Sequence, residues 1–487
     1  MSSAAADAPA RAVRDIRLVL LVNVLTIPLS LATNLILGRI SAEALGWYGA
    51  VQIFVAAFNT FVILGGAPVF SRMVPAMPSD ERPSFLLSYF TLVLGILSLV
   101  TLVALVVPGA REAVLSRFGG PSWALAYGVC AMALVNAFAT HFLYAVGKGP
   151  RAATALKLVI VGYFIAALLA ATVLRDALTH DPAGYMWRAT ALVYLGAALV
   201  SVLWLKETAE FSGTVRARFA LPAGFWPVVG YTHVGTIVEF TFGQLYPALV
   251  LVWVDVLALS RLHAALRFVS LLALVPVMLT SVLAPGLAKL EASGLREQAL
   301  RQAAAALRGC IVFLAPCVYA LILFAPAAMG IFGHDFGDYA RVLRFVAPMA
   351  LAGPVVYIGG GMAVAFGAFR GYLWVSMVFV AASTVLACLV IPRWGLLGAA
   401  AAGTVGAYVQ QAAMAQVIRR KLGFRVPFRA SAAWIVALLT LAYAELVRPG
   451  PVAAAAGWVA ALLLFALLGS VPVAEVRSLA ARALGAS

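Results

Sequence analysis

Apolar runs of about 20 residues follow one another along almost the whole chain, separated by short segments rich in Pro, Gly and Arg. A run of this length crosses the hydrocarbon core of a bilayer as one α-helix. Of the 487 residues, 64% are hydrophobic and only 11% are charged, whereas soluble domains carry about 25% charged residues. A soluble fold of this length has too little interior to hide so much apolar surface. We therefore expect an all-α polytopic membrane protein.

The chain is predicted to contain about fourteen transmembrane helices. We expect two six-helix bundles around a central cavity, followed by two extra helices at the C-terminus. The first apolar segment has no small-residue cleavage site after it, so it is interpreted as a retained helix rather than a secretory signal. The predicted helices are 18–38, 45–67, 85–107, 122–146, 154–174, 186–205, 223–252, 257–284, 309–331, 342–366, 372–391, 396–418, 431–447 and 452–470.

The two predicted bundles resemble each other in sequence. The segment "ALGWYGAVQIFV" (44–55) aligns without a gap with "ALSRLHAALRFV" (258–269), and a repeat with an even number of helices has a parallel arrangement. The polar segment after the sixth helix is the expected linker. The predicted organisation is a cytoplasmic N-terminal segment 1–17, a first bundle 18–205, a cytoplasmic linker 206–221, a second bundle 222–420, the extra helices 421–470 and a cytoplasmic tail 471–487.

The distribution of basic residues predicts the orientation. If the N-terminus lies inside, most of the 34 Lys and Arg residues fall in cytoplasmic segments, as the positive-inside rule requires. Both termini are then cytoplasmic, and the amphipathic segment 286–309 is expected to lie along the cytoplasmic surface. The formal net charge of +16 is explained by topology and by attraction to anionic membrane lipids, and no nucleic-acid partner is expected.

Glu239 lies near the middle of the apolar run 228–250. Residues spaced three, four and seven apart share a helix face, and the face of Glu239 carries small and polar residues, including Thr232, Thr236 and Tyr246. Intramembrane acids usually face a bundle interior or a cavity. We therefore interpret Glu239 as a candidate site for a coupling proton or cation. A neutral carboxyl group hydrogen-bonded to Thr or Tyr, and a direct substrate contact, remain alternatives.

The next predicted helix carries the complementary charge. His263 and Arg267 share one face with two serines, and Arg267 lies about ten residues from the outer end, roughly 15 Å deep. A buried guanidinium needs an anion, which could be Glu239 or a substrate phosphate, because Arg binds phosphate in a bidentate manner. The alternative is an Arg that reaches back to the outer surface.

Neutral polar side chains form stripes on three other predicted helices. Amides and hydroxyls facing a shared interior suit the hydroxyl groups of a sugar, and they equally suit hydrogen bonds between helices. The candidate substrate-cavity residues are Arg267, His263, Asn23, Asn34, Gln52, Asn59, Tyr408 and Gln411.

Sequence patterns for enzymatic chemistry are absent. There is no GxxxxGK[ST] phosphate loop, so the chain does not supply its own ATPase. It has neither paired catalytic carboxylates nor a Ser nucleophile motif. The four cysteines lie in apolar segments without His or Asp neighbours and are interpreted as small buried hydrophobes rather than metal ligands. We do not expect an enzyme.

Three segments carry a resemblance to a known family. They are "LILGRISAEALGWYGAVQIFVAAFNTFVILGGAPVFSR" (35–72), "LILFAPAAMGIFGHDFGDYARVLRFVAP" (321–348) and "LVIPRWGLLGAAAAGTVGAYVQ" (389–410). In the first, Arg39 closes one helix and Gly46 and Tyr48 open the next. Over residues 15–425 the chain resembles bacterial polysaccharide and O-antigen flippases of the multidrug/oligosaccharidyl-lipid/polysaccharide exporter superfamily. It departs from them at "SRLHAA" (260–265), where relatives often repeat Gly-x-Tyr.

The resemblance implies a function. Such a transporter flips an undecaprenyl-pyrophosphate-linked oligosaccharide, the repeat unit of a lipopolysaccharide or exopolysaccharide, across the bacterial inner membrane by alternating access. Its expected partners are the lipid-linked substrate, a polysaccharide polymerase and other export proteins. No cofactor is expected apart from a coupling proton or sodium ion acting through Glu239. The alternatives are a multidrug/cation antiporter of the same fold or a lipid II flippase. The short outer loops and the lack of catalytic acids argue against a membrane-embedded glycosyltransferase or ligase.

The predicted orientation can be tested with single cysteines. The loop 332–341 should be periplasmic and the loop 419–429 cytoplasmic. A cysteine at Gly333 should react with a membrane-impermeant thiol reagent in intact cells, and one at Gly423 should react only after the membrane is permeabilised. The reverse labelling pattern would overturn the orientation.

Overall fold

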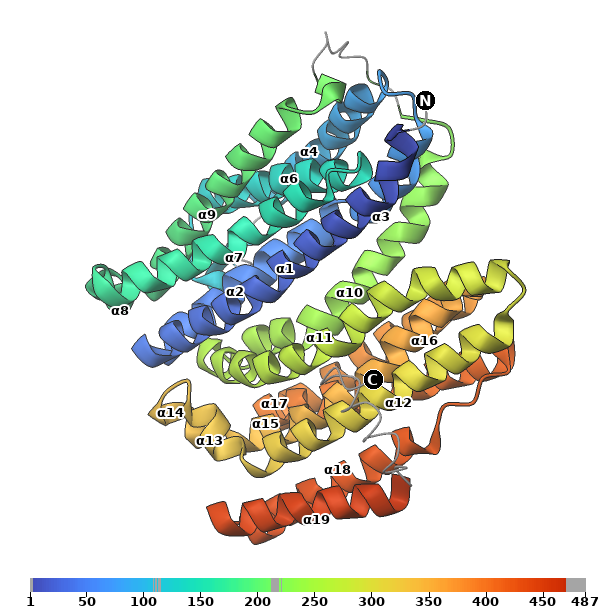
Figure 1. The fold of residues 1–487 in the computed structure, drawn as a ribbon. Helices are drawn as coiled ribbons and strands as arrows, with labels where there is room; N and C mark the ends of the chain where they lie inside the picture. Colours follow the sequence, from blue (N-terminus) through green and yellow to red (C-terminus); the bar gives the residue numbers. More distant parts are fainter. Residues whose placement is uncertain are drawn as a thin grey trace. The chain divides into compact units, whose positions relative to one another are not determined.

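The computed structural model describes residues 3–469 except 108, 110–111, 113–114, 212–218 and 220. The described residues form α-helices and short 3₁₀ helices without a strand (Figure 1). This confirms the all-α polytopic membrane protein expected from the sequence. The predicted cytoplasmic tail 471–487 lies outside the described residues.

The chain divides into two compact units, Met1–Ser260 and Arg261–Ser487. The boundary falls within helix α11. The helices of the first unit are α1 (Ser3–Ile40), α2 (Ala42–Val62), α3 (Ala67–Met73), η1 (Val74–Ala76), α4 (Arg82–Val106), η2 (Ser116–Phe118), α6 (Trp123–Ala145), α7 (Gly149–Thr172), α8 (Arg175–His180), α9 (Pro182–Lys206), η3 (Ala209–Phe211) and α10 (Phe225–Trp253).

The second unit begins inside α11 and contains the remaining helices. They are α11 (Val256–Ala292), α12 (Arg296–Leu323), α13 (Ala325–Gly330), α14 (His334–Gly337), α15 (Ala340–Val346), η4 (Ala347–Ala352), α16 (Gly353–Ala365), α17 (Phe369–Leu422), α18 (Phe428–Val447) and α19 (Pro451–Gly469).

Each of the fourteen predicted segments overlaps a helix, although the count of membrane-crossing helices differs. Among the described residues, eleven helices are long and apolar enough to cross a membrane, or twelve if the two segments of the bent helix α10 form one span. Two of the predicted segments, 372–391 and 396–418, fall within the 54-residue helix α17. A kink at Gly395, three residues after Pro392, separates them. In α1 the described apolar part, Leu25–Ile40, is shorter than a full span.

One loop prediction differs from the structure. The segment 286–309 is not a separate surface helix, because α11 continues to Ala292 and α12 starts at Arg296, so the segment forms the two ends of a helical hairpin. The predicted division between the halves at the linker 206–221 stays a prediction, and the first compact unit also contains α10. Helix α10 belongs to it because it packs against α2 and α3.

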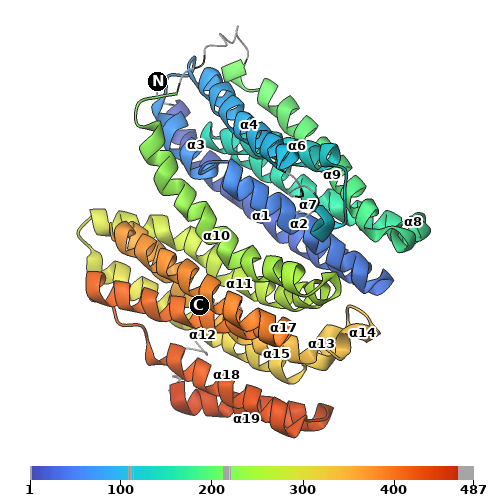
Figure 2. The ribbon, with the colours of Figure 1, turned by 180° about the vertical axis from the view of Figure 1, so that it is seen from behind.

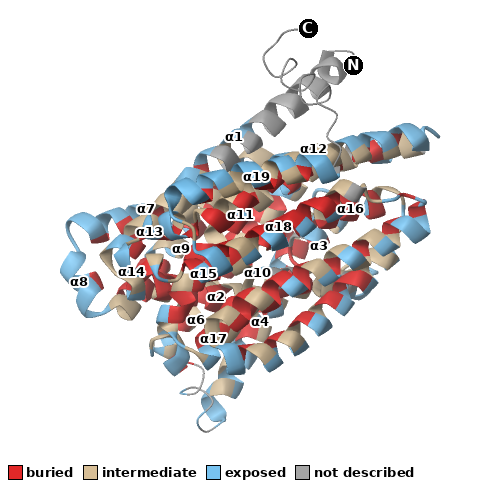
Figure 3. Ribbon diagram, turned by 90° about the horizontal axis from the view of Figure 1, so that it is seen from below, coloured by how far each residue is buried: buried red, intermediate tan, exposed pale blue. Residues whose placement is uncertain are grey.

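Helices of the first unit pack against one another in pairs. The most extensive contacts join α1 to α7 and α6 to α9, and both pairs lie side by side in Figures 1 and 2. Buried residues gather where the helices of one unit face each other, whereas the short helix α8 is almost entirely exposed (Figure 3). An aromatic cluster fills the interior near α3, with Phe70, Tyr89 and Phe138 in mutual ring contact.

The two extra C-terminal helices attach to α12 through hydrogen bonds to main-chain carbonyl groups. Tyr319 of α12 donates its hydroxyl to Ala433 O in α18 at 3.1 Å, and Trp458 of α19 donates its indole N–H to Pro316 O in α12 at 3.0 Å. Helices α18 and α19 also pack along each other (Figure 2).

An ion-pair cluster joins α18 to α15. Glu445 accepts from Arg341 Nε at 2.7 Å and from Arg344 Nη1 at 3.1 Å. The side chain of Arg344 is 9% exposed, whereas that of Arg341 is 55% exposed. Removing one partner of a buried pair leaves an uncompensated charge, and an exposed pair contributes little. Arg344 and Glu445 therefore form the pair on which this contact depends.

The two arginines should respond differently to substitution. We expect Glu445→Gln and Arg344→Gln each to lower the free energy of unfolding by up to about 3–5 kcal/mol. The matched variant Arg341→Gln should cost at most about 1 kcal/mol. Thermal unfolding in detergent measures all three, and equal losses for Arg341→Gln and Arg344→Gln would contradict this assignment.

Backbone conformation also refines the labelling positions proposed above. Gly333 and Gly423 have φ values of 145° and 69°, which a cysteine adopts only with strain. Their exposed neighbours His334 and Arg425 are better positions for the same test.

Candidate functional site

Helix α11 uses one face for contacts within the second unit. The Arg261 guanidinium lies 3.6 Å from the ring centroid of Tyr339, and the rings of Phe268 and Phe332 are 5.7 Å apart in an edge-on contact. Further along, Pro276 packs closely against Gly353. These contacts define the face of α11 that is turned toward its own unit.

His263, Arg267 and Ser270 lie on a different face of α11. At about 100° per residue, they are roughly 100–180° around the axis from Arg261 and Phe268. They also lie within the membrane-crossing segment Val256–Thr280. The second unit therefore presents a histidine and an arginine within a membrane-spanning segment, on a face that does not make the contacts described above.

Two hydrogen bonds join Arg267 to His263. Arg267 donates from Nε to His263 Nε2 at 3.1 Å, and its Nη2 lies 2.7 Å from the same nitrogen. Because Nε2 accepts, it carries the lone pair, and the ring proton belongs on Nδ1. A neutral imidazole thus orients the guanidinium. Arg267 starts about eleven residues into α11, ~16 Å along its axis, which is close to the middle of a ~30 Å hydrocarbon core.

Three predicted amide side chains lie in the first unit. Asn34 is fully buried in α1 and donates to Ser30 O at 2.6 Å. Asn34 Oδ1, Gln52 Nε2 and Asn59 Oδ1 are buried atoms without a hydrogen-bond partner in the structure. An unsatisfied buried polar atom costs about 1–3 kcal/mol, so these three amides retain capacity for a polar group that is not part of the described chain.

A hydrogen bond between α7 and α9 inside the first unit was not revealed by the sequence. Tyr163 of α7 donates to Thr190 Oγ1 of α9 at 3.1 Å. The ring of Tyr48 makes an edge-on contact with Tyr163, with centroids 5.1 Å apart. Neither Tyr163 nor Thr190 was among the candidate residues that the sequence indicated.

Tyr408 and Gln411, predicted for the cavity, both contact α18. The indole N–H of Trp434 donates to Gln411 Oε1 at 2.6 Å, and the ring of Trp434 packs on that of Tyr408. The carbonyl of Gln411 is thus engaged by one of the two extra helices. A substrate role for these two residues stays a prediction, as does that of Asn23, whose side chain lies outside the described part of the structure.

The side chain of Glu239 is likewise not described, but its place on α10 is. The helix segments Phe225–Val238 and Gly243–Trp253 meet at an angle of 58°. Glu239 is the first residue after Val238 and so lies at this bend.

A second helix break lies close to α10. Between α2 and α3 the residues Leu64, Gly65 and Gly66 all have positive φ. The buried hydroxyl of Tyr89 is 2.7 Å from Ile63 O and 2.8 Å from Leu64 O. A side chain on Gly65 would collide with Thr232 of α10. One hydroxyl thus lies within hydrogen-bond distance of two carbonyls of the break, and Gly65 lies against α10.

Solved membrane proteins share this fold. The structure superposes on the lipid II flippase MurJ in an inward closed conformation with a TM-score of 0.64 and 15% identity, covering 92% of this chain and 98% of that one. It superposes on an inward-facing multidrug resistance MATE family transporter of the MOP superfamily with a TM-score of 0.59 and 16% identity, covering 82% and 95%. The chain has their fold.

Sequence comparison is more limited. No protein-family model matches the chain. A stretch of 126 residues is 31% identical to the probable multidrug resistance protein NorM of Burkholderia mallei, and the same holds for its counterpart from Burkholderia pseudomallei. The match covers 23% of this chain and 26% of each relative. It therefore spans about a quarter of the length of these curated relatives.

Proposed function

We propose that the chain is a transporter that flips an undecaprenyl-pyrophosphate-linked oligosaccharide across the bacterial inner membrane by alternating access. The observation that carries the proposal is the Arg267–His263 pair on α11. A membrane-embedded guanidinium held by a neutral imidazole is a preorganised anion site, and its planar donor fork matches phosphate. The pyrophosphate of the lipid-linked sugar is the proposed anion.

The first unit supplies groups suited to the sugar. Asn34, Gln52 and Asn59 each retain a buried polar atom without a partner in the structure, and neutral amides both donate to and accept from sugar hydroxyls. The likeness in fold to a lipid II flippase is consistent with a substrate that combines a lipid, a pyrophosphate and a saccharide. Both termini are proposed to be cytoplasmic, as the distribution of basic residues predicts.

Glu239 is the proposed coupling site. It lies at the bend of α10, where binding a proton or sodium ion would change the charge of the helix within the membrane. A carboxylate in this environment is costly, so neutralising it would favour a different arrangement of the two halves of α10. An ion gradient acting there would drive the cycle in one direction.

A multidrug/cation antiporter is the second candidate. The 31% identity with NorM over 126 residues favours it. A cationic substrate would need an anionic contact in the membrane, for which Glu239 is available, and the guanidinium of Arg267 would oppose it. The two candidates thus assign Arg267 opposite effects, which makes it the deciding residue.

Substitution of Arg267 should separate the two candidates. We expect Arg267→Ala to lower the rate of flipping by roughly ten- to a hundredfold, because a hydrogen bond to a charged group contributes about 1.5–3 kcal/mol. Arg267→Lys should keep part of the activity because the charge remains. The measurement uses vesicles with a fluorescently labelled undecaprenyl-pyrophosphate saccharide and a membrane-impermeant quencher.

Arg261 provides the matched control on the same helix. It contacts Tyr339 on the face turned toward its own unit, so Arg261→Gln should flip the probe at the normal rate when reconstituted at equal amount. Normal flipping by Arg267→Ala would overturn the anion site. Faster export of a cationic dye by Arg267→Ala would favour the antiporter instead.

The coupling proposal has its own test. Glu239→Gln removes the charge and keeps the shape, so the variant should still flip the probe but lose its acceleration by a pH or sodium gradient. Glu43→Gln, at an exposed position in the first turn of α2, is the control and should respond to the gradient normally. An unchanged gradient response in Glu239→Gln would remove this residue from the mechanism.

A further inference from the structure

Two side chains that can carry a positive charge stand together on one face of α11. Arg267 approaches His263 Nε2 with Nε at 3.1 Å and with Nη2 at 2.7 Å. A ring nitrogen that accepts a hydrogen bond carries no proton, so the imidazole in this arrangement is neutral. It orients the guanidinium without cancelling its charge. The proposed function uses the guanidinium for a phosphate and gives the histidine only a supporting role.

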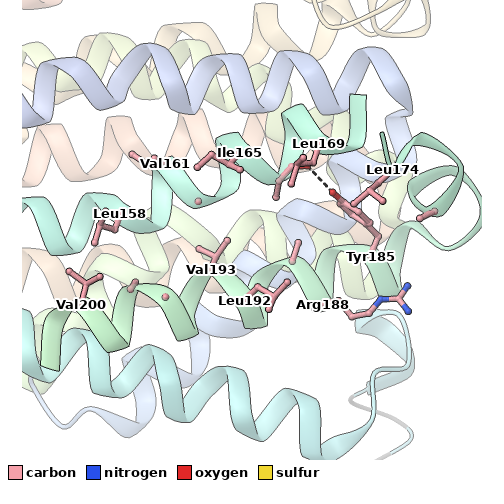
Figure 4. Close-up of a pocket in the computed structure, with 16 residues that line it drawn as sticks. Leu158, Val161, Ile165, Leu169, Leu174, Tyr185, Arg188, Leu192, Val193 and Val200 are labelled. Atoms are coloured by element: carbon pink, nitrogen blue, oxygen red, sulfur yellow. Dashed lines mark hydrogen bonds between the residues drawn. The ribbon is translucent and has the colours of Figure 1, made fainter. Parts of the chain in front are cut away.

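Arg188 of α9 has a different kind of partner. It lies near one end of an apolar groove between α7 and α9 (Figure 4). Asp181 is 3.0 Å away, and both side chains are more than half exposed. The neighbouring hydroxyl of Tyr185 donates to Ala166 O at 2.7 Å. The carboxylate of Asp181 cancels the charge of Arg188, so this pair brings no net charge to a ligand. A neutral imidazole, in contrast, leaves the charge of its arginine in place.

The charge of the proposed ligand calls for a second cation. A lipid-linked sugar joined through pyrophosphate has two acidic phosphoryl groups, each with one negative charge. A sugar joined through a single phosphodiester has one such group. The guanidinium of Arg267 neutralises one negative charge and leaves the other within the membrane, where an uncompensated ion is expensive. A proton on His263 supplies the second positive charge.

Protonation changes what His263 does in the site. Both ring nitrogens of an imidazolium are donors, so Nε2 then donates to an anion instead of accepting from Arg267. Because Nε of Arg267 lies 3.1 Å from Nε2, phosphoryl oxygens that contact the guanidinium are also within reach of the histidine. A nearby anion favours the charged form of an imidazole. The anion and the proton therefore strengthen each other's binding by the same factor.

Other ionisable groups on the described elements that contact α11 lie at different levels of this helix or on the face of Arg261, which is roughly 160° from His263. They are Glu43 of α2, which meets α11 at Val256; His334, Asp335, Asp338 and Tyr339 in and after α14; and Tyr357 of α16, which meets α11 at Pro276 and Thr280. Glu239 of α10, whose side chain is not described, is a further acid, and the experiment includes it.

We infer that His263 takes up a proton when a pyrophosphate binds beside Arg267, so that the site selects a doubly charged pyrophosphate diester over a singly charged phosphodiester. The proton comes from the aqueous solution. The inference rests on the proposed function for the nature of the anion. It adds the distinction between pyrophosphate-linked and monophosphate-linked substrates, and it makes His263 a residue that determines specificity.

Calorimetry measures the proton directly. The purified full-length protein in detergent is titrated with undecaprenyl-pyrophosphate-linked N-acetylglucosamine, the pyrophosphate probe, or with undecaprenyl-phosphate-linked N-acetylglucosamine, the phosphodiester probe. Buffers of different ionisation enthalpy report the protons exchanged. The wild type should take up about one proton with the pyrophosphate probe and none with the phosphodiester probe. Its affinity for the pyrophosphate probe should rise by up to about tenfold for each unit by which the pH is lowered, because one proton binds with the ligand.

His263→Gln separates the proton from the support of Arg267. The glutamine Oε1 still accepts from a guanidinium but takes up no proton. The variant should bind the pyrophosphate probe roughly ten- to a hundredfold more weakly, because it loses a hydrogen bond between charged groups. It should bind the phosphodiester probe normally. The matched controls are His334→Gln, at an exposed position of α14, and Arg188→Gln, and both should bind the two probes as the wild type does.

Three results would overturn the inference. The first is tight binding of the pyrophosphate probe by the wild type without proton uptake. The second is proton uptake that persists in His263→Gln and disappears in Glu239→Gln, which would place the proton on the glutamate. The third is an equal loss of both probes in His263→Gln, which would leave the histidine only a supporting role for Arg267.

Failure of the proposed function gives a different pattern. If Arg267→Ala binds the pyrophosphate probe normally, the anion site is wrong and the inference falls with it. If the wild type takes up a proton with the pyrophosphate probe but does not flip the labelled saccharide in vesicles, the transport proposal fails and the role of His263 stands. If the wild type flips the saccharide but binds the probe without a proton, only the inference fails.

Discussion

The satisfaction of backbone polar groups in lipid is the constraint on which this structure depends. A straight helix meets it internally, but each break leaves carbonyl or N–H groups that lipid cannot bond. At the break between α2 and α3 the buried hydroxyl of Tyr89 serves the carbonyls of Ile63 and Leu64. The 3₁₀ stretch η4 and the kink at Gly395 in α17 are further departures from regular helix. Protein groups therefore surround the break between α2 and α3 and the mostly buried η4, whereas the residues just before Gly395 are exposed.

The sequence predicted the helices well because the length of an apolar run directly reflects the thickness of the bilayer. It predicted their grouping less well. The polar segment 206–221 indicates a loop. The packing of α10 against α2 and α3, which the sequence does not show, places α10 in the first compact unit. The segment 286–309 is amphipathic, and the same pattern is produced by two helix ends that leave the membrane as a hairpin. The bend of α10 ends at Gly243, four residues before Pro247, and a proline inside a helix removes the hydrogen bond to the carbonyl four residues earlier.

The candidate site was predictable where it follows helical periodicity. His263 and Arg267 are four residues apart, so one face of one helix was enough to bring them together. Contacts between different helices could not be predicted from the periodicity of one helix. Trp434 reaches Gln411 across a loop, and Tyr163 meets Thr190 from another helix. The Gly46 and Tyr48 pair of the family-like segment gains a physical explanation only from these contacts, because Gly46 allows the close approach of Val256 and Tyr48 packs on Tyr163.

The hydrogen bonds that attach α18 and α19 to α12 determine which positions of this contact can change during evolution. In both hydrogen bonds to α12 the donor is a side chain, on Tyr319 or Trp458, and the acceptor is a main-chain carbonyl, at Ala433 or Pro316. Any amino acid supplies a carbonyl oxygen, so the acceptor positions can change without loss of these bonds. Selection on these hydrogen bonds then falls on the tyrosine and the tryptophan, whereas the acceptor positions are limited only by the packing of their side chains, as at the buried Ala433.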